Sequence, residues 1–110
     1  MIKRKLSKTS EFKKVFSEGR RLEGKNLIIF ILKNDYDFNR LGIIVKKEIG
    51  KAVVRNKIKR RLKETSRLLN KKLLPGHDII VLAKNNIKEA NYFELCYDLE
   101  GLLYKEKLFL

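Results

Sequence analysis

One stretch of the sequence concentrates the side chains that could bind a polyanion. Residues 51–72 hold ten Lys and Arg residues against a single acid, Glu64. Arginine can hold a phosphate through two hydrogen bonds, and the amide of Asn56 can donate to a phosphate or to a 2′-hydroxyl. Helix faces rich in lysine are often merely solvated, but they usually alternate charges of both signs. We therefore interpret this stretch as a contact surface for RNA or DNA.

The same stretch has the periodicity of a helix with its cations gathered on one side. At about 100° per residue, an apolar stripe within an arc of about 80° comprises Val54, Ile58, Leu62, Thr65 and Leu69. A ridge within about 120° on the same geometry comprises Arg55, Asn56, Lys59, Lys63 and Arg67. The stripe is narrow and suits packing on a core, whereas the ridge could follow a row of phosphates.

Three phenylalanines, Phe12, Phe16 and Phe30, form a second possible contact set. Bases of single-stranded RNA stack on exposed aromatic rings that lie beside cations. Phenylalanine at helical spacing is also typical of a hydrophobic core, and the periodicity alone favours the core for these three residues.

No set of residues typical of catalysis or of metal binding occurs in the sequence. His77 is the only histidine and Cys96 the only cysteine, too few for a zinc site or an internal disulfide. Gly42 and Gly50 lack the spacing of a phosphate-binding loop. We expect no catalytic residue, no metal ligand and no small-molecule substrate.

The composition predicts a single RNA-binding domain over residues 1–110. The chain is 44% hydrophobic, enough for a core, and its net charge of +14 indicates a polyanionic partner. The longest wholly apolar run, 27–32, is far too short for a bilayer span, and no apolar run of signal length follows the basic N-terminus. A lone cysteine fits a reducing compartment. We expect a cytoplasmic protein with no membrane partner.

Around the basic stretch, turn residues and apolar periodicity predict five further elements. Residues 7–19 are expected to form a helix, capped by Ser7 or Ser10 and ended by a left-handed Gly19. Apolar runs predict strands at 26–33 and 40–47, and their short polar connection predicts an antiparallel hairpin. Residues 20–24 could be a short strand or a loop.

The second half of the chain alternates helix and strand. The long helix is expected from Gly50 to about Asn70, with Pro75 and Gly76 ending that element. A strand is predicted at 77–83 and a last helix from Asn91 to about 105. Apolar candidates on that helix are Phe93, Leu95, Cys96, Leu99, Leu102 and Leu103. The fold class is α+β, with helices packed on a sheet that is covered on parts of both faces.

These residues resemble a known family. The run from Arg40 to Lys47, continued from Gly50 to Arg60, closely resembles the signature of the bacterial ribonuclease P protein family. The first helix, with Phe12 and Phe16, and the strand beginning at His77 also look like those of the family. The resemblance implies a two-layer α/β sandwich in the order helix-strand-strand-strand-helix-strand-helix. Its four-stranded sheet, with residues 20–23 as first strand, would contain an unusual left-handed crossover.

The resemblance also implies a function. In this family an RNA subunit hydrolyses the phosphodiester bond with bound Mg²⁺, and one protein assists one RNA subunit in removing the 5′ leader of precursor tRNA. The residues expected to face the RNA subunit are Arg55, Asn56, Lys57, Lys59, Arg60, Lys63 and Arg67. Those expected in a leader-binding cleft between first helix and sheet are Phe12, Phe16, Phe30, Lys46, Lys47, Lys51 and Lys84.

Two residues depart from the commoner family pattern. Glu48 stands where a further cation is usual, and Lys57 stands where many members have arginine. Lysine keeps the charge but loses the two-pronged hydrogen bonding of arginine. Three alternatives remain open: a structural RNA-binding module such as a ribosomal protein, a nuclease acting alone and a peripheral membrane protein. Cleavage by the protein alone is disfavoured by the missing catalytic set, and membrane binding by the narrow apolar stripe.

Overall fold

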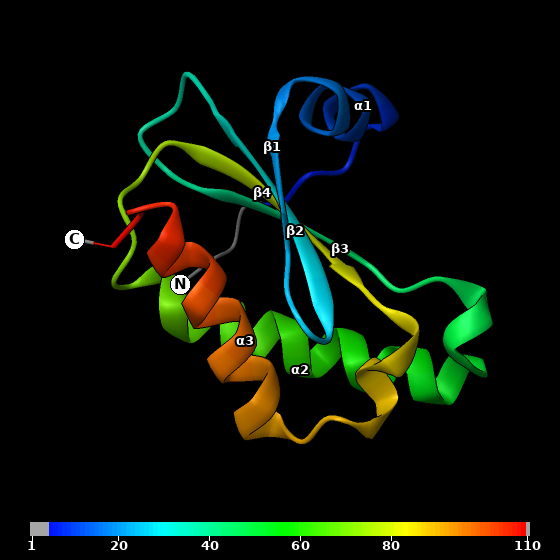
Figure 1. The fold of residues 1–110 in the computed structure, drawn as a ribbon. Coiled ribbons are helices and arrows are strands. Elements are labelled where there is room, and N and C mark those ends of the chain that lie inside the picture. The colour runs from blue at the N-terminus through cyan, green and yellow to red at the C-terminus, as the bar shows by residue number, and fades with distance from the viewer. Residues whose placement is uncertain (1–4, 110) are drawn as a thin grey trace.

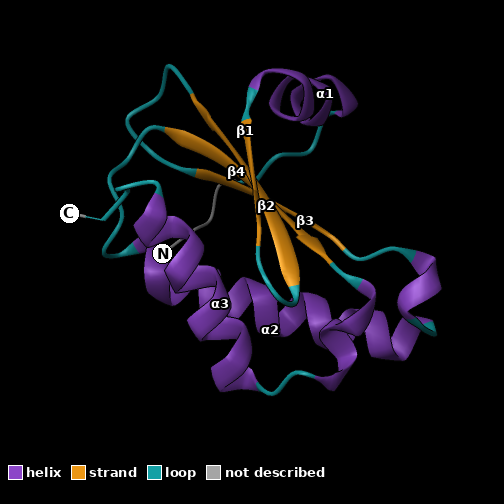
Figure 2. Cartoon of the chain, viewed as in Figure 1, coloured by secondary structure: helices purple, strands orange, loops and turns teal. Residues whose placement is uncertain are grey.

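The computed structural model describes residues 5–109 and has a four-stranded sheet with three α-helices (Figures 1 and 2). The elements in chain order are α1 (Thr9–Glu18), β1 (Arg20–Glu23), β2 (Leu27–Lys33), β3 (Arg40–Ile44), the 3-10 helix η1 (Lys47–Ile49), α2 (Ala52–Asn70), β4 (His77–Ala83), the 3-10 helix η2 (Asn85–Glu89) and α3 (Tyr92–Lys105). This is the α+β order that the sequence resemblance implied, and residues 20–23 are a strand.

The sheet has the strand order β1-β2-β4-β3, and this overturns the predicted hairpin of β2 with β3. β4 lies between the two, antiparallel to β2 and parallel to β3. Five of the seven β4 residues are buried, and a strand so apolar on both faces belongs inside a sheet rather than at its edge. The parallel pair β3 and β4 is joined by a crossover through α2. The short polar turn between β2 and β3 therefore connects two strands that do not pair with each other.

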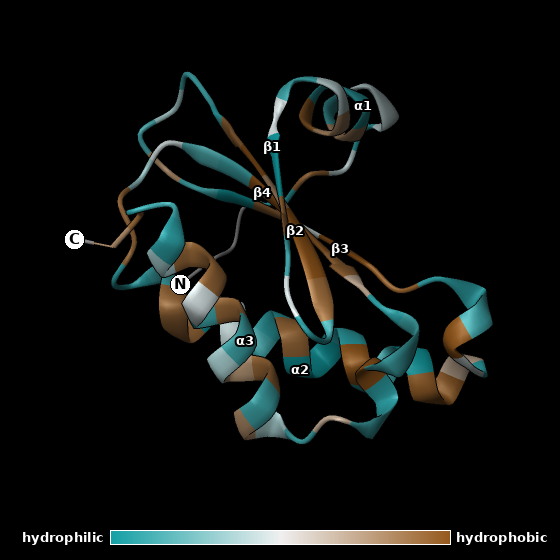
Figure 3. Ribbon diagram, viewed as in Figure 1, coloured by the Kyte–Doolittle hydropathy of each residue, from teal (hydrophilic) through white to brown (hydrophobic). Residues whose placement is uncertain are grey.

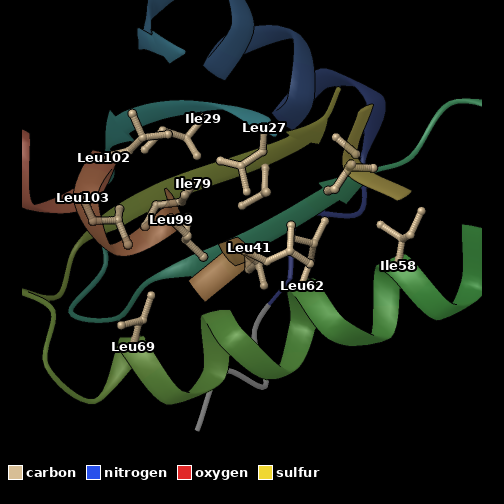
Figure 4. Close-up of a cluster of buried hydrophobic side chains, with 14 of the residues drawn as sticks. Leu27, Ile29, Leu41, Ile58, Leu62, Leu69, Ile79, Leu99, Leu102 and Leu103 are labelled. Atoms are coloured by element: carbon tan, nitrogen blue, oxygen red, sulfur yellow. The ribbon is translucent and has the colours of Figure 1, made fainter. Parts of the chain in front are cut away.

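One face of the sheet carries the main core. Leu27, Ile29 and Ile31 alternate along β2 and share this face with Ile79 and Val81 of β4. α2 and α3 cover the face, as Figure 1 shows, and the close-up of Figure 4 shows leucines and isoleucines of both layers meeting. The helix residues buried in this cluster are Ile58, Leu62, Leu69, Leu95, Leu99, Leu102 and Leu103.

The opposite face of the sheet is covered in part by α1, which lies across the sheet from α2 and α3 (Figure 1). Val15 of α1, Ile80 of β4 and Leu6 form a smaller buried cluster, with Phe12 and Phe30 packed against it. The inner strands therefore need apolar residues on both faces, which explains the continuous apolar runs of β2 and β4 in the sequence. Figure 3 shows β2 largely in brown, whereas β1 is mostly teal.

Several details of the predicted helices differ in the structure. α1 begins at Thr9, and its first turn is capped by Glu11, which accepts from the backbone N–H groups of Ser7 and Lys8. Gly19 is extended (φ −80°) rather than left-handed. A Cβ there would lie 2.5 Å from the Val15 carbonyl oxygen, so close packing, not an unusual φ, explains the glycine.

The apolar stripes are also narrower than the sequence indicated. Val54 is exposed at the start of α2, and Phe93 on α3 is 79% exposed. Cys96 is only half-buried. Val54 and Phe93 lie in the first turn of their helices, and Cys96 lies beside the buried Leu95 of α3. Among residues 5–109, no helix is both long and apolar enough to cross a membrane.

Candidate RNA-binding surface

The solvent side of α2 presents the predicted row of cations. Ile58, Leu62 and Leu69 point into the core, and this fixes the helix so that its other side faces outward. Of the predicted RNA-binding residues, five are exposed: Asn56, Lys57, Lys59, Arg60 and Lys63. Arg55 and Arg67 are half-buried. The helical period thus places all seven residues at the surface, as the sequence predicted.

Two of these arginines already have partners within the protein. The Arg55 Nε donates to the Gly50 carbonyl oxygen at 3.1 Å, which ties the helix to the preceding turn. Arg67 is ion-paired with Glu64 at 2.6 Å, and this hydrogen bond lowers the pKa of the Glu64 carboxyl. Within the described part of the chain, the other α2 cations of the set have no ion pair. Their charge is therefore available to a polyanion.

The N-terminal end of α2 adds to this positive surface. Lys51 is the N-cap residue, no side chain caps the first turn, and that turn contains no acid. Free backbone N–H groups and the helix dipole favour an anion at such an end. Lys46 and Lys47 lie just before, at the end of β3 and the start of η1, and both are exposed.

The aromatic residues of the predicted cleft lie on the face of the sheet that α1 covers. The rings of Phe16 on α1 and Phe30 on β2 meet edge to face, with centroids 4.8 Å apart. Phe16 is 39% exposed and Phe30 is half-buried. Phe12 packs instead against Gly42 of β3. Phe16 is thus an accessible ring beside a half-buried one. Phe12 lies one turn earlier on the same face of α1 and is half-buried.

Two of the predicted lysines lie at one hollow farther along the same face. Lys46 and Lys84 line a hollow of about 460 Å³, whose apolar wall includes Ile28 and Leu82. Ile28 is two residues from Phe30, so both point to the same side of β2. The Nζ of Lys84 is bound to Glu23 Oε2 at 2.7 Å and lowers the pKa of that carboxyl. Glu48 lines this hollow too, which places an acid beside Lys46.

A buried ionic cluster that the sequence analysis missed holds α1 against the sheet. Arg40 of β3 makes a two-pronged pair with Asp78 of β4, at 2.8 and 2.7 Å, and also contacts Glu11 of α1. Asn34 donates to the same Asp78 at 2.8 Å. Asp78 is only 5% exposed. The sequence did contain a signal for this cluster, because Asp78 is an acid inside the apolar run 77–83. A buried charge requires a partner.

The described residues contain no group of three or more His, Cys, Asp or Glu side chains that could hold a metal ion.

The structure also brings together residues from α1, β3 and α2 around a second, larger hollow of about 770 Å³. The sequence did not indicate this hollow. It is lined by Lys5, Leu6 and Gly42 together with Phe12 and side chains of α2, and these residues share no sequence motif.

Comparison with known proteins gives the family. The family model described as Ribonuclease P matches residues 2–107. Among similar proteins, the ribonuclease P protein component of Caldanaerobacter subterraneus subsp. tengcongensis is 42% identical over 105 residues, covering 96% of this chain and 90% of that protein. That of Clostridioides difficile is 39% identical over 99 residues, covering 89% and 87%.

Solved structures agree. The RNase P protein of Staphylococcus aureus superposes with a TM-score of 0.88 at 31% identity, covering 96% of this chain and 97% of that one. The RNase P protein of Thermotoga maritima gives 0.85 at 31% identity, covering 94% and 97%. The matched fold, together with the exposed basic helix, leads to one conclusion: this chain belongs to the ribonuclease P protein family.

Proposed function

We propose that this chain is the protein subunit of ribonuclease P, an endoribonuclease that removes the 5′ leader of precursor tRNA. One protein binds one catalytic RNA subunit, and the RNA carries out the hydrolysis with Mg²⁺ that it holds mainly itself. The protein contributes no catalytic residue. It acts in the cytoplasm on precursor tRNA, without a membrane or a small-molecule substrate.

The observation that carries this proposal is the exposed face of α2, whose cations at 57, 59, 60 and 63 have no ion pair with an acid of residues 5–109. Lys57, Lys59, Arg60 and Lys63 would neutralise phosphates of the RNA subunit and release counterions, a contribution that weakens steeply with salt. Arg55 and Asn56 lie at the start of the same face. Screening of phosphate repulsion would lower the Mg²⁺ concentration needed for assembly and cleavage.

The leader would lie on the α1 side of the sheet. Phe16 offers a ring on which an unpaired base can stack, and Phe30 holds that ring edge to face at 4.8 Å. Lys46, Lys47 and Lys51 would bind the leader phosphates. Lys84, held by Glu23, contributes less charge of its own. Phe12 lies one turn before Phe16 on the same face of α1, half-buried over Gly42 of β3, and belongs to the leader set by family resemblance.

Leader release at low Mg²⁺ tests this function. The protein is added to a bacterial ribonuclease P RNA with labelled precursor tRNA, and the 5′ leader is followed with time. We expect cleavage at Mg²⁺ concentrations where the RNA alone is inactive, and no cleavage by the protein alone. Unchanged cleavage would favour a structural RNA-binding module, whereas cleavage without the RNA subunit would favour an independent nuclease.

A further inference from the structure

The outer side of α3 carries an aromatic surface that the fold leaves uncovered. Its three rings, Phe93, Tyr97 and Tyr104, are 79%, 84% and 73% exposed. At about 100° per residue, they fall within about 40° of the helix circumference. The opposite side of the helix carries the buried leucines that hold it on the core, Leu95, Leu99, Leu102 and Leu103. A surface helix normally has one apolar stripe, so packing within the single chain does not explain the second one.

The aromatic surface of α3 also differs from the rest of the protein in its charge. In a chain of net charge +14, this helix holds three acids, Glu94, Asp98 and Glu100, against one base, Lys105. It lies at the β1 side of the sheet, where it shares a hollow with the β1–β2 turn, whereas cations of α2 lie beside β3, the strand at the other edge. The aromatic surface is therefore separate from the basic one, and its acids repel phosphate.

A hole at the centre of this surface can receive a ring from another molecule. Gly101 is exposed, and a Cβ added there would meet no atom within 4 Å. Glycine inside a helix lowers its stability, so local structure does not explain this residue. Together with Tyr97, Glu100 and Tyr104, it lines the hollow of about 520 Å³. Residues at i, i+3, i+4 and i+7 form the hole that accepts one side chain when two helices pack.

The aromatic surface is complementary to a second copy of itself. Two α3 helices packed antiparallel about a two-fold axis near Leu99 bring Tyr97 of each copy over Gly101 of the other. Phe93 of each copy then meets Tyr104 of the other. A two-fold interface needs one surface that supplies both partners, and these residues do so.

The charges beside the rings fit the same antiparallel arrangement. Glu94 and Lys105 lie on one flank of α3, about 20° apart on the helical geometry, so the two-fold axis brings each opposite the other. Both are exposed, and neither has an ion pair within residues 5–109. The Asn91 N–H donates to Glu94 Oε1 at 3.2 Å and holds this carboxylate in place.

The area of the rings sets the expected strength of such a contact. A buried aromatic side chain covers about 150–250 Å², so six rings of this exposure would bury on the order of 700–1,200 Å². Stable interfaces bury about 1,200–2,000 Å², and weak ones bury less. Two chains of net charge +14 also repel each other. The contact is therefore weak in the free protein, and salt strengthens it by screening the repulsion.

We propose that the aromatic surface of α3 binds a second copy of this chain, so that two protein subunits join through their α3 helices. The α2 cations beside β3 stay free in each subunit, and so does α1, which lies on the other face of the sheet (Figure 1). The inference goes beyond the proposed function and does not rest on RNA binding. It gives the protein a self-association surface in addition to its basic one.

Sedimentation velocity of the full chain without RNA tests the proposal. We expect a reversible monomer–dimer equilibrium whose dissociation constant is at least about threefold lower at about 0.5 M salt than at about 0.1 M. Non-specific association through charge would weaken with salt instead and would contradict the proposal. A monomer at every concentration up to about 1 mM would overturn it and leave the surface to a different protein.

Two substitutions on α3 locate the contact. Tyr97→Ala removes the central ring, and Gly101→Gln fills the hole, where the free chain has room for a side chain. Each should raise the dissociation constant at least about tenfold, while the melting temperature of Gly101→Gln is unchanged or higher. Val53→Gln, which removes an exposed apolar side chain of α2, should associate as the unmodified protein does. Unchanged association of both α3 variants would overturn the proposal.

A matched pair of charge reversals tests the antiparallel packing. Lys105→Glu and Lys14→Glu change the net charge equally, and Lys14 is an exposed residue of α1, on the far side of the sheet. Lys14→Glu should strengthen association slightly, because it lowers the repulsion between the two chains. Lys105→Glu should weaken it, because an acid then faces Glu94. Equal strengthening by both variants would contradict this packing.

Leader release separates this proposal from the proposed function. With the RNA subunit at low Mg²⁺, Gly101→Gln should promote release as the unmodified protein does. Loss of release in this folded variant would place α3 in the RNA interface and overturn the proposal. If the unmodified protein does not promote release, the proposed function is wrong, and sedimentation still decides whether α3 joins two copies.

Discussion

Glu11 of α1 and Arg40 of β3 form an ion pair that joins the first helix to the sheet. The same Glu11 carboxylate accepts from the backbone N–H groups of Ser7 and Lys8 at 3.0 and 2.9 Å, and so caps α1. Arg40 in turn is held by Asp78 through two hydrogen bonds. Since Phe12 and Phe16 belong to α1, this pair sets the position of both rings over the sheet.

Removal of the Arg40 guanidinium should destabilise the fold strongly. Arg40→Met leaves the buried Asp78 carboxylate without its main partner, and the loss of one member of a buried pair costs about 3–5 kcal/mol. Arg21→Met is the matched control, because the pair of Arg21 with Glu23 is exposed and such pairs contribute at most about 1 kcal/mol. Urea unfolding measures both. Equal losses of unfolding free energy would contradict a structural role for the cluster.

The capping carboxylate makes stability depend on pH in a defined range. The backbone N–H groups of Lys8 and Ser7, with Arg40, lower the pKa of Glu11 from 4.5 to about 2. Because the folded pKa is below the unfolded pKa, the stabilisation is complete above about pH 4.5 and is lost as the pH falls toward 2. The difference in unfolding free energy between the unmodified protein and Glu11→Gln should shrink over that interval. A constant difference from pH 6 to pH 2 would show that the Glu11 charge is not involved.

Loss of the exposed ring of Phe16 should affect leader binding selectively. One base stacked on an aromatic ring contributes about 1–3 kcal/mol, so Phe16→Ala is expected to weaken precursor tRNA binding by the holoenzyme about tenfold. Mature tRNA, which lacks the leader, should bind almost unchanged. Phe93→Ala, on the exposed face of α3, is the control for removal of a surface phenylalanine. Equal losses for precursor and mature tRNA would rule out Phe16 as a leader contact.

The ion pair of Glu64 with Arg67 should restrain RNA binding. Glu64→Gln removes the only acid of residues 51–72 and releases Arg67, so the affinity for the RNA subunit is expected to rise. The association constant for the RNA subunit falls as salt rises, and Arg60→Gln should reduce the steepness of this fall, in log K against log salt concentration, by about 0.7–0.9. Arg67→Gln should reduce it by less, because Glu64 already neutralises that arginine. Filter binding at several salt concentrations measures these slopes. Identical slopes for both arginine variants would contradict the argument.

The local features of the chain followed from the sequence alone. The strands at 27–33 and 77–83 and the helices at 52–70 and 92–105 lie within two residues of their predicted limits, because apolar periodicity and turn residues act over a few neighbouring positions. The outward position of Arg60, Lys59 and Lys63 also followed, since a helix with one apolar stripe must turn its other side to solvent.

Strand pairing was decided only by the tertiary structure. The short polar segment between β2 and β3 predicted a hairpin, and this prediction was wrong. The insertion of β4 depends on burying an apolar strand on both faces. The order of turns along the chain does not determine which strands pair. For the same reason the position of Lys46 and Lys84 at one hollow, across 38 residues of sequence, was visible only in the fold.

What the sequence determined by itself was therefore the charge, the elements and the family resemblance, each a property of residues close together in the chain. What the tertiary structure decided was which residues share a surface: Glu11 with Arg40 and Asp78, Phe16 with Phe30, and Phe12 with the cations of α2. These groupings arise from long-range packing of α1 and α2 on opposite sides of the sheet. They depend on the burial of apolar area over the whole domain, which no single segment specifies.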